Sequence, residues 1–228
     1  MRIGVIIPAL NEAECLPGLL GKVRAMPGDT LEVVVVDNGS TDATAAVARA
    51  CGARVASEAR RGYGYACAAG VRAAPGSEVL VFVDGDGSFD PAEMPALLAP
   101  LRGETADLVL GSRLLGGQVR GMLPHQHFGN WLTTRIMRQL YGLPLTDLGP
   151  YRAVRADLLA RLDMREMTYG WPTEMIVKAA RRRAGLVEVP VTYHARRGGR
   201  SKVSGTLAGS ALAAYHILRV TLRYGVSG

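Results

Sequence analysis

Residues 79–87 read Val-Leu-Val-Phe-Val-Asp-Gly-Asp-Gly, five apolar side chains followed directly by two acids and two glycines. An apolar run of this length, ended by turn residues, is typical of a strand that is buried on both faces. In the loop after it, Asp84 and Asp86 can direct both carboxylates toward one cation, and Gly85 lets a phosphate approach the backbone. Mg²⁺ and Mn²⁺ prefer oxygen ligands and are commonly shared between carboxylates and substrate phosphates. The stretch therefore predicts a metal–diphosphate site, with a simple strand-capping turn as the alternative.

Strands and helices alternate around this run, which predicts an α/β fold with a mostly parallel central sheet covered by helices on both faces. Asp90 before Pro91 predicts the start of a helix that reaches about Leu101. Ser40 or Thr41 is predicted as the N-cap of a further helix. The other predicted strands of the first half cover residues 3–7, 31–36, 54–56 and 108–110, and the second predicted helix covers residues 42–51.

Polar residues follow four of these strands, at 8–12, 37–40, 84–88 and 112–113. Right-handed crossovers bring the carboxyl ends of parallel strands to one edge of the sheet, where open α/β sheets bind ligands. The four groups are therefore expected to meet in one site.

The second half is less regular. Residues 122–130 are predicted as a loop and residues 131–141 as a helix. Residues 146–152 are predicted as a turn that enters a strand or short segment, 172–183 as a helix, 186–193 as a strand and 195–205 as a basic, glycine-rich loop. A largely apolar last helix is predicted at 206–224.

The composition fits one large domain. The chain has 228 residues, of which 48% are hydrophobic and 21% charged, enough for a sizeable core. Its three cysteines lack the spacing of disulfide or zinc frameworks and predict small core residues in a reducing compartment. The N-terminal apolar run breaks at Pro8 and is predicted as a strand, not a signal peptide. The sequence has no uninterrupted apolar run of ~18 residues, so no membrane-spanning helix is expected.

The net charge of +7 conceals an asymmetry. Up to Leu114, ten basic residues stand against fourteen acidic ones, a net charge of −4. From Leu115 onward, seventeen stand against six, a net charge of +11. A basic half suits nucleic acid, an anionic membrane or phosphorylated substrates. Because no groove-reading or base-stacking motif accompanies it, we expect no nucleic-acid partner.

Several motifs together resemble the inverting family 2 glycosyltransferases, and their order and spacing resemble the polyprenyl-phosphate sugar transferase branch that includes dolichyl-phosphate mannosyltransferase. They are IIPALNEAE (6–14), VVVVDNGSTDAT (33–44), RGYGYACAAG (61–70), VFVDGDGSFDP (81–91), LVLGSR (108–113), TDLGPYRAVR (146–155) and GGRSKVSG (198–205). The resemblance implies the GT-A fold in a single domain over 1–205. Residues 1–114 would form the nucleotide-sugar half, residues 115–205 the acceptor half, and residues 206–228 an amphipathic appendage.

On the donor side, the resemblance assigns nucleotide contacts to Pro8, Leu10, Asn11, Glu12, Asp37, Arg61, Gly62, Asp84 and Gly85. Asp37 would hold the base, although its Asp-Asn-Gly-Ser turn is also stable by itself. Asp84 and Asp86 would hold Mg²⁺ or Mn²⁺ on the donor diphosphate. Ser88 stands where the mannosyl branch more often has glutamine, so a third protein ligand is not expected there.

On the acceptor side, the resemblance points to Arg113, His127, Asp147 and Arg152. Arg200 and Lys202 resemble a basic loop that closes over the donor diphosphate. Glu174 stands where many family 2 enzymes carry a catalytic carboxylate. The predicted catalytic set consists of Asp86, Arg113, Glu174, Arg200 and Lys202.

The resemblance implies transfer of a hexose from a UDP-glucose or GDP-mannose type donor to a polyprenyl or dolichyl phosphate at the membrane surface. The chain would then be a cytoplasmic protein bound peripherally to the inner face of the cell membrane. The alternative acceptor is a saccharide or small-molecule hydroxyl, with Glu174 as the base. The helix at 206–224 fits a membrane-surface helix, a helix packed on its own core and a homodimer contact equally well.

Two other classes fit the sequence less well. A sugar-phosphate nucleotidyltransferase would carry a glycine- and arginine-rich loop after the first strand, where residues 8–12 read Pro-Ala-Leu-Asn-Glu. A catalytically silent nucleotide-sugar binder would not need both Asp84 and Asp86.

Overall fold

The computed structural model describes residues 1–26, 30–115, 122–195 and 207–226. Its elements are β1 (Arg2–Ala9), α1 (Leu16–Arg24), β2 (Thr30–Asp37), α2 (Thr44–Ala50), β3 (Arg54–Ser57), α3 (Tyr63–Ala73), β4 (Val79–Phe82), the short 3₁₀ helix η1 (Pro91–Glu93), α4 (Met94–Arg102), β5 (Leu108–Ser112), α5 (Pro124–Tyr141), β6 (Arg152–Arg155), α6 (Ala156–Leu162), α7 (Trp171–Arg181), β7 (Leu186–Pro190) and α8 (Leu207–Val226).

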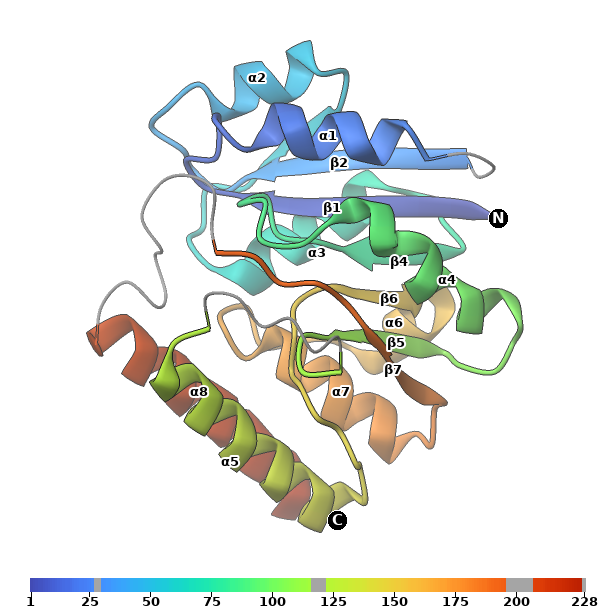
Figure 1. The fold of residues 1–228 in the computed structure, drawn as a ribbon, viewed down its shortest axis with the longest axis vertical. Helices are drawn as coiled ribbons and strands as arrows, with labels where there is room; N and C mark the ends of the chain where they lie inside the picture. Colours follow the sequence, from blue (N-terminus) through green and yellow to red (C-terminus); the bar gives the residue numbers. More distant parts are fainter. Residues whose placement is uncertain (27–29, 116–121, 196–206, 227–228) are drawn as a thin grey trace.

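The strands form one sheet in the order β3-β2-β1-β4-β6-β5-β7 (Figure 1). All neighbouring pairs are parallel except those of β6, which runs antiparallel to both β4 and β5. The prediction of a mostly parallel sheet is therefore confirmed. β6 comes from the second half of the chain and lies between two strands of the first half, so both halves share one sheet.

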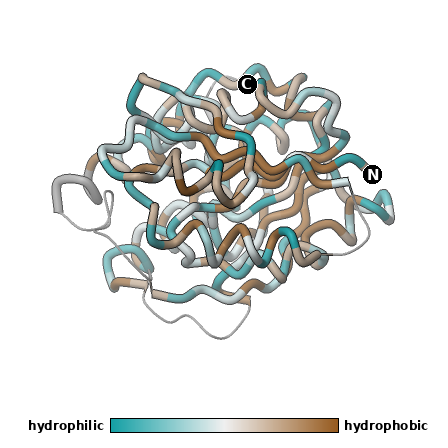
Figure 2. Tube along the Cα trace, turned by 90° about the horizontal axis from the view of Figure 1, so that it is seen from above, coloured by the Kyte–Doolittle hydropathy of each residue, from teal (hydrophilic) through white to brown (hydrophobic). Residues whose placement is uncertain are grey.

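Alternating side chains of the strands enter two cores, one on each face of the sheet. In β1, Ile3, Val5 and Ile7 join the core under α1 and α4, whereas Ile6 joins the core under α3 and α7. In Figure 2 the hydrophobic strands form a central band between more hydrophilic outer segments. Burial on both faces explains why β4 reads as a continuous apolar run.

The helices α5 and α8 lie side by side and pack against α7, outside the layer that covers the sheet (Figure 1). Predicting a loop at 122–130 was wrong from Pro124 onward, where α5 begins. Proline suits a first helical turn because its missing N–H needs no partner there. The Gln126 side chain also accepts a hydrogen bond from the Leu123 N–H at 2.8 Å, which stabilises the helix start.

The start of α2 also differs from the prediction. The helix begins at Thr44, and neither Ser40 nor Thr41 is its N-cap. Both residues instead bond to Asn11 in the loop after β1. The predicted N-cap role of Asp90 is confirmed, since its side chain accepts a hydrogen bond from the Ala92 N–H.

Candidate active site

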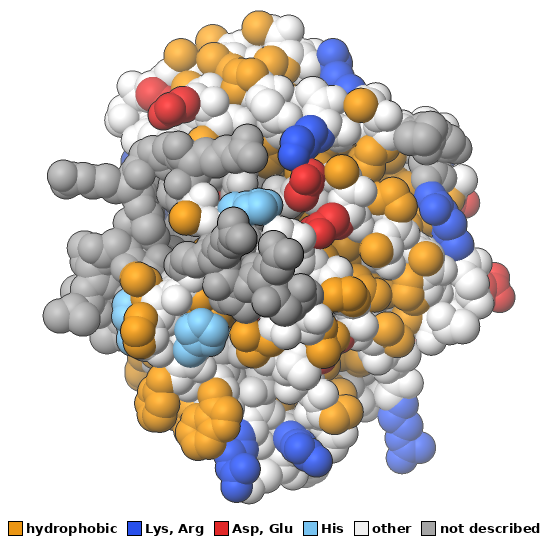
Figure 3. All heavy atoms as spheres, viewed as in Figure 1, with side chains coloured by type: hydrophobic (Ala, Val, Ile, Leu, Met, Phe, Trp, Pro, Cys, Tyr) orange, Lys and Arg blue, Asp and Glu red, His pale blue; other side chains and the backbone are white. Residues whose placement is uncertain are grey.

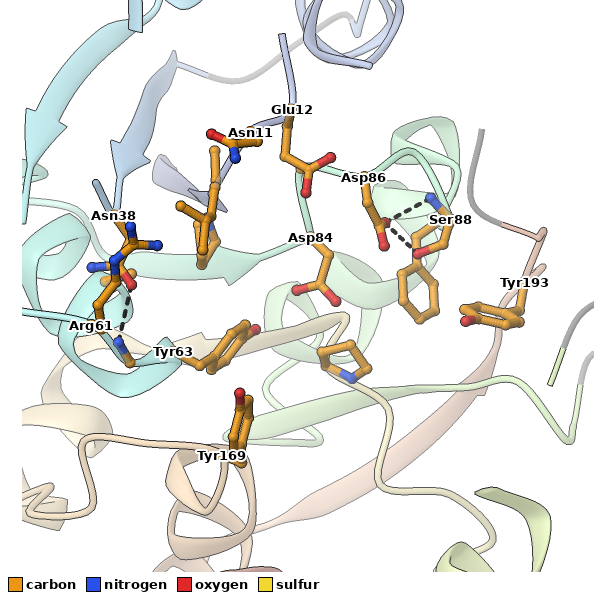
Figure 4. A pocket seen from close by; sticks show the side chains of 18 of the residues that line it. Asn11, Glu12, Asn38, Arg61, Tyr63, Asp84, Asp86, Ser88, Tyr169 and Tyr193 are labelled. Atoms are coloured by element: carbon orange, nitrogen blue, oxygen red, sulfur yellow. Dashed lines mark hydrogen bonds between the residues drawn. The ribbon is translucent and has the colours of Figure 1, made fainter. Parts of the chain in front are cut away.

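A pocket of about 640 Å³ opens at the carboxyl ends of β1, β4 and β5 (Figure 4). β1 has β2 on one side and β4 on the other, so the connections leave it in opposite directions and open a crevice at the strand ends. The pocket is lined by Pro8, Ala9, Leu10, Asn11, Glu12, Asn38, Arg61, Gly62, Tyr63, Ala66, Asp84, Gly85, Asp86, Ser88, Phe89, Arg113, Pro150, Tyr169 and Tyr193.

Ser88 orients the carboxylate of Asp86. Asp86 Oδ1 accepts a hydrogen bond from the Ser88 backbone N–H at 3.0 Å and another from its hydroxyl at 2.6 Å (Figure 4). Gly87 between them has φ +71°, a left-handed conformation that glycine adopts without strain. The serine at this position therefore positions an acid of the pair through a hydrogen bond.

Asp84 points into the pocket between Glu12 and Tyr63 (Figure 4). Its Oδ1 is buried and has no hydrogen-bond partner in the described part of the chain. Burial and the nearby charge of Asp86 raise the pKa of Asp84 to about 7, against the opposing effects of the Tyr63 hydroxyl and the Arg113 charge. A bound cation would offset both the burial of this carboxylate and its repulsion by Asp86.

This acid pair fits a divalent cation that is shared with a substrate. Among the described residues, no group of three or more His, Cys, Asp and Glu side chains could hold a metal. Mg²⁺ needs only one or two protein carboxylates when phosphates and waters complete its coordination. The buried oxygen of Asp84 without a partner is the position at which such an ion would supply the missing interaction.

Asn11 joins the loop after β1 to the turn after β2. It adopts a left-handed conformation with φ +57°. Its N–H donates to the Ser40 hydroxyl at 2.9 Å, and its side-chain oxygen accepts from the Thr41 N–H at 2.7 Å. Asp37 is not among the lining residues. Its carboxylate accepts from the Ser40 N–H at 2.9 Å, the self-contained turn that the sequence left open as an alternative.

The loop before α3 approaches the backbone before α7 so closely that only glycine fits. Gly62 has φ +149°, and a Cβ on it would lie 2.5 Å from the Met167 carbonyl oxygen. A Cβ on Gly64 would lie 2.6 Å from a neighbouring carbonyl oxygen. The Asn38 side chain accepts a hydrogen bond from the Gly62 N–H at 3.1 Å and links this loop to the turn after β2. The packing keeps the exposed Arg61 at the edge of the pocket.

Arg113 enters the pocket already held by Asp147. Its Nε and one terminal nitrogen each donate to the Asp147 carboxylate at 2.7 Å, and its backbone N–H donates at 2.9 Å. The Arg113 side chain is 13% exposed and that of Asp147 is fully buried. Burial opposes the charge on Arg113, yet the hydrogen bond and charge of Asp147 leave its pKa raised. The arginine is therefore a permanent, oriented positive charge, and it lies 5.2 Å from the Tyr193 ring centre.

Asp147 and Arg152 support the site from outside the pocket lining. Glu188 on β7 accepts hydrogen bonds from the Thr146 and Asp147 N–H groups and holds the turn that carries Asp147. The buried Arg152 guanidinium donates to the carbonyl oxygens of Gly149 at 2.6 Å and Pro172 at 2.8 Å. Burial lowers the pKa of Arg152. Neither predicted acceptor residue reaches the pocket directly.

Glu174 does not line the pocket. Its carboxylate is fully buried and accepts hydrogen bonds from Tyr224 at 2.8 Å and from the Arg165 and Glu166 N–H groups, and it pairs with Lys178 at 2.7 Å. Burial opposes its charge, but these partners leave its pKa lowered. A carboxylate with so many donors is a poor base, so this arrangement does not support the predicted catalytic role of Glu174.

The remaining predicted site residues lie elsewhere. His127 is exposed on the first turn of α5 and is not among the lining residues. Arg200 and Lys202 lie outside the described residues.

Five polar lining residues had no predicted contact of their own: Asn38, Tyr63, Ser88, Tyr169 and Tyr193. Asn38, Tyr63 and Ser88 lie inside the motifs that resemble the family, close to residues with predicted contacts. Tyr193 follows β7, so the rule that ligands meet the carboxyl ends of parallel strands would have found it. Tyr169 stands in the segment before α7, and no local signal marks it.

A solved structure shares this fold. Glucosyl-3-phosphoglycerate synthase from Mycobacterium tuberculosis, in complex with Mn²⁺, UDP-glucose and phosphoglyceric acid, is similar with a TM-score of 0.77. The similarity covers 98% of this chain and 79% of that chain at 24% sequence identity. The chain has the GT-A glycosyltransferase fold, as the sequence predicted.

Sequence comparison identifies the family. Residues 4–163 match the model of Glycosyl transferase family 2, and the chain belongs to that family. It is 38% identical over 226 residues to the undecaprenyl-phosphate mannosyltransferase of Micrococcus luteus, which covers 93% of this chain and 91% of the relative. It is 40% identical over 215 residues to an uncharacterised glycosyltransferase of Mycobacterium tuberculosis, covering 92% and 94%. The resemblance to the polyprenyl-phosphate branch is confirmed, and the chain is a glycosyltransferase.

Proposed function

We propose that this glycosyltransferase moves a hexose from a UDP-glucose or GDP-mannose type donor to a polyprenyl or dolichyl phosphate, with inversion at the anomeric carbon. The undecaprenyl-phosphate mannosyltransferase of Micrococcus luteus supports this acceptor class, because it matches nearly all of both chains. The acceptor lipid lies in a bilayer, so the enzyme would work peripherally at the inner face of the cell membrane.

On the donor side, the loops after β1 and β2 and the turn before α3 would enclose the nucleotide. Asp84 and Asp86 would hold Mg²⁺ or Mn²⁺, and the fold neighbour solved with Mn²⁺ and UDP-glucose supports this reading. The ion, when bound, would supply positive charge to the departing nucleotide diphosphate. Arg200 and Lys202 are proposed to contact the same diphosphate.

On the acceptor side, the oriented Arg113 would bind the lipid phosphate. A phosphate oxygen would attack the anomeric carbon as the bond from that carbon to the diphosphate oxygen breaks, and the electron pair would leave with the nucleotide. The protein's contribution would be positioning and charge stabilisation.

The environment of Glu174 is the observation that favours a phosphate acceptor over a hydroxyl. A hydroxyl acceptor needs a base to take its proton, whereas a phosphate monoester is ionised near neutral pH. Glu174 is tied to four donors and buried away from the pocket. Of the described residues, only Glu12, Asp84 and Asp86 bring carboxylates to the lining, and the last two are assigned to the ion.

A transfer assay with labelled GDP-mannose and UDP-glucose tests the proposal. A short polyprenyl phosphate and the matching free polyprenol serve as the two acceptors. We expect sugar on the phosphate only, loss of transfer with EDTA and recovery with Mn²⁺. Glu174→Gln should lower stability but keep kcat in the folded fraction. Transfer to the free alcohol, together with loss of kcat in Glu174→Gln, would instead favour a hydroxyl acceptor.

A further inference from the structure

Large exposed hydrophobic side chains are concentrated on one part of the surface. In the described part of the chain, all of them except Met1 lie on α5, on α8 or in the short segments before α5. Phe128 is 62% exposed, Trp131 55% and Tyr215 59%. Figure 3 shows hydrophobic side chains gathered where α5 lies in Figure 1, with basic side chains beside them. An exposed patch of large apolar and aromatic residues marks an interaction surface.

The exposed stripe of α5 changes from aromatic to basic along the helix. Phe128 and Trp131 stand one turn apart, with ring centres separated by 5.9 Å. Arg135 and Arg138 continue the same stripe at helical spacing, and both are exposed. The opposite side of the helix, with Met137, is buried against the protein.

α8 repeats this pattern next to α5. Leu212 and Tyr215 come first, followed by the exposed Arg219 and Arg223. The two helices run in the same direction (Figure 1), and the Tyr141 hydroxyl at the end of α5 donates to a carbonyl oxygen near the end of α8 at 2.5 Å. The aromatic ends therefore lie together, as do the basic ends.

Neither helix contains an aspartate or a glutamate over residues 124–141 or 207–226. The surface of these two helices is therefore complementary in charge to an anionic partner, because it carries arginines and neither helix has an acid that would repel one. Amphipathic aromatic rings favour the membrane interface, and arginines near them attract anionic headgroups. We propose that the outer surface of the α5–α8 pair docks onto an anionic lipid bilayer.

This docking surface is connected to the active site. The pocket residue Arg113 is followed directly by the exposed Leu114 and Leu115. From α5, the buried Asn130 side chain donates to the Thr146 carbonyl oxygen at 2.8 Å and accepts from the Leu148 N–H at 3.0 Å. The two bonds flank the residue that orients Arg113. The inference deepens the proposed function, since docking at α5 would bring the proposed acceptor-phosphate site to the bilayer surface.

No helix in the described part of the chain combines the length and hydropathy needed to cross a membrane. The surface would therefore lie on the bilayer, with its rings at the headgroup level and its arginines among the phosphates. Each arginine near an anionic surface contributes a factor of about five in binding, and each apolar side chain fully buried at the interface about tenfold or more.

Vesicle flotation of the intact chain tests the docking surface, with no sugar donor and no polyprenyl phosphate present. One set of vesicles is pure phosphatidylcholine, and the other contains about one third phosphatidylglycerol. Phe128→Ala/Trp131→Ala should lower the partition coefficient on the anionic vesicles at least about tenfold. Arg135→Gln/Arg138→Gln should lower it about 25-fold on anionic vesicles and leave binding to neutral vesicles unchanged.

Arg49→Gln/Arg54→Gln is the matched control, because it removes the same charge from α2 and β3 at the other end of the molecule (Figure 1). It should bind anionic vesicles within about twofold of the wild type. If the partition coefficient on anionic vesicles fell equally in this control and in Arg135→Gln/Arg138→Gln, the proposal would be overturned. A wild-type chain that does not float but forms a dimer that Phe128→Ala/Trp131→Ala dissociates would also overturn it.

Calorimetric nucleotide binding by the Phe128→Ala/Trp131→Ala variant separates this proposal from the proposed function. Binding equal to the wild type shows that the pocket is intact and that any flotation defect belongs to the surface. A chain that floats but transfers no sugar to polyprenyl phosphate would refute the proposed function and leave the docking surface standing.

Discussion

Replacing Asp147 with asparagine removes one charge from a nearly buried ion pair while keeping the side chain's shape. Asp147 is fully buried and Arg113 is 13% exposed, and three hydrogen bonds of 2.7–2.9 Å join them. In Asp147→Asn, one oxygen becomes an NH₂ group that faces the N–H donors of the arginine. The guanidinium is then left enclosed without its counter-charge.

Breaking a buried pair by removing one partner costs about 3–5 kcal/mol, because the other charge stays desolvated. Domains are typically stable by about 5–15 kcal/mol, so Asp147→Asn would remove a large share of the free energy of unfolding. For a chain of this size, that loss corresponds to a fall in Tm of roughly 6–20 °C.

Urea unfolding followed by circular dichroism measures this loss directly. Asp157→Asn is the matched control, since it makes the same chemical change in the exposed Asp157–Arg161 pair, whose side chains are 66% and 60% exposed. An exposed pair one helical turn apart contributes only about 0.3–0.5 kcal/mol. The two variants should therefore differ by several kcal/mol.

The same variant has a functional readout. Because Asp147 orients the Arg113 guanidinium, the variant loses this orientation toward the proposed acceptor phosphate. The KM for polyprenyl phosphate should rise while the Kd of the nucleotide stays close to that of the wild type. If Asp147→Asn lost no more stability than Asp157→Asn, or weakened nucleotide binding as much as acceptor use, the reasoning about this pair would be refuted.

Three further predictions concern other parts of the site and scaffold. Asp86→Asn should abolish Mn²⁺-dependent binding of UDP or GDP in calorimetry and leave the circular dichroism spectrum unchanged; retained metal dependence would contradict the assignment. Gly64→Ala should lower Tm and nucleotide affinity because its Cβ would meet a carbonyl oxygen at 2.6 Å, whereas Gly129→Ala, with nothing within 4 Å, should raise helix stability by about 1 kcal/mol. A hydrogen bond from Arg60 holds the pKa of Glu58 at about 2, below its usual 4.5. The ionised Glu58 therefore stabilises the fold above about pH 4.5, and this stabilisation is lost as the pH falls toward 2. In Glu58→Gln, the free energy of unfolding should depend less on pH in that window.

Much of the site could be predicted because the loops that build it are local in sequence. The loops that follow strands of four to eight residues carry acids, amides and glycines, and parallel strands end at the same edge. This places Asn11, Asp84, Asp86 and Arg113 in one pocket. The family follows from the same loops, since they carry the motifs that its members share.

The surroundings of other predicted residues could not be predicted, because they depend on what a side chain meets from distant parts of the chain. Glu174 stands where many family 2 enzymes carry a catalytic carboxylate, yet the folded chain surrounds it with Lys178, Tyr224 and two backbone donors. Arg152 has the charge expected of an acceptor-site residue, yet it is buried among carbonyl oxygens. Whether a charge faces a pocket or a set of buried partners is decided by packing.

The apolar and polar periods of the sequence determined the strands, most helices and the edge at which the loops meet, because these depend on neighbours a few residues apart. Tertiary structure alone decided that Asp147 holds Arg113 and that Asn11 joins two loops. It also decided that α5 lies parallel to α8, with the exposed aromatic residues at one end and exposed arginines at the other. Such contacts join residues far apart in the chain, and local periodicity does not encode which distant surfaces meet when two cores close around one sheet.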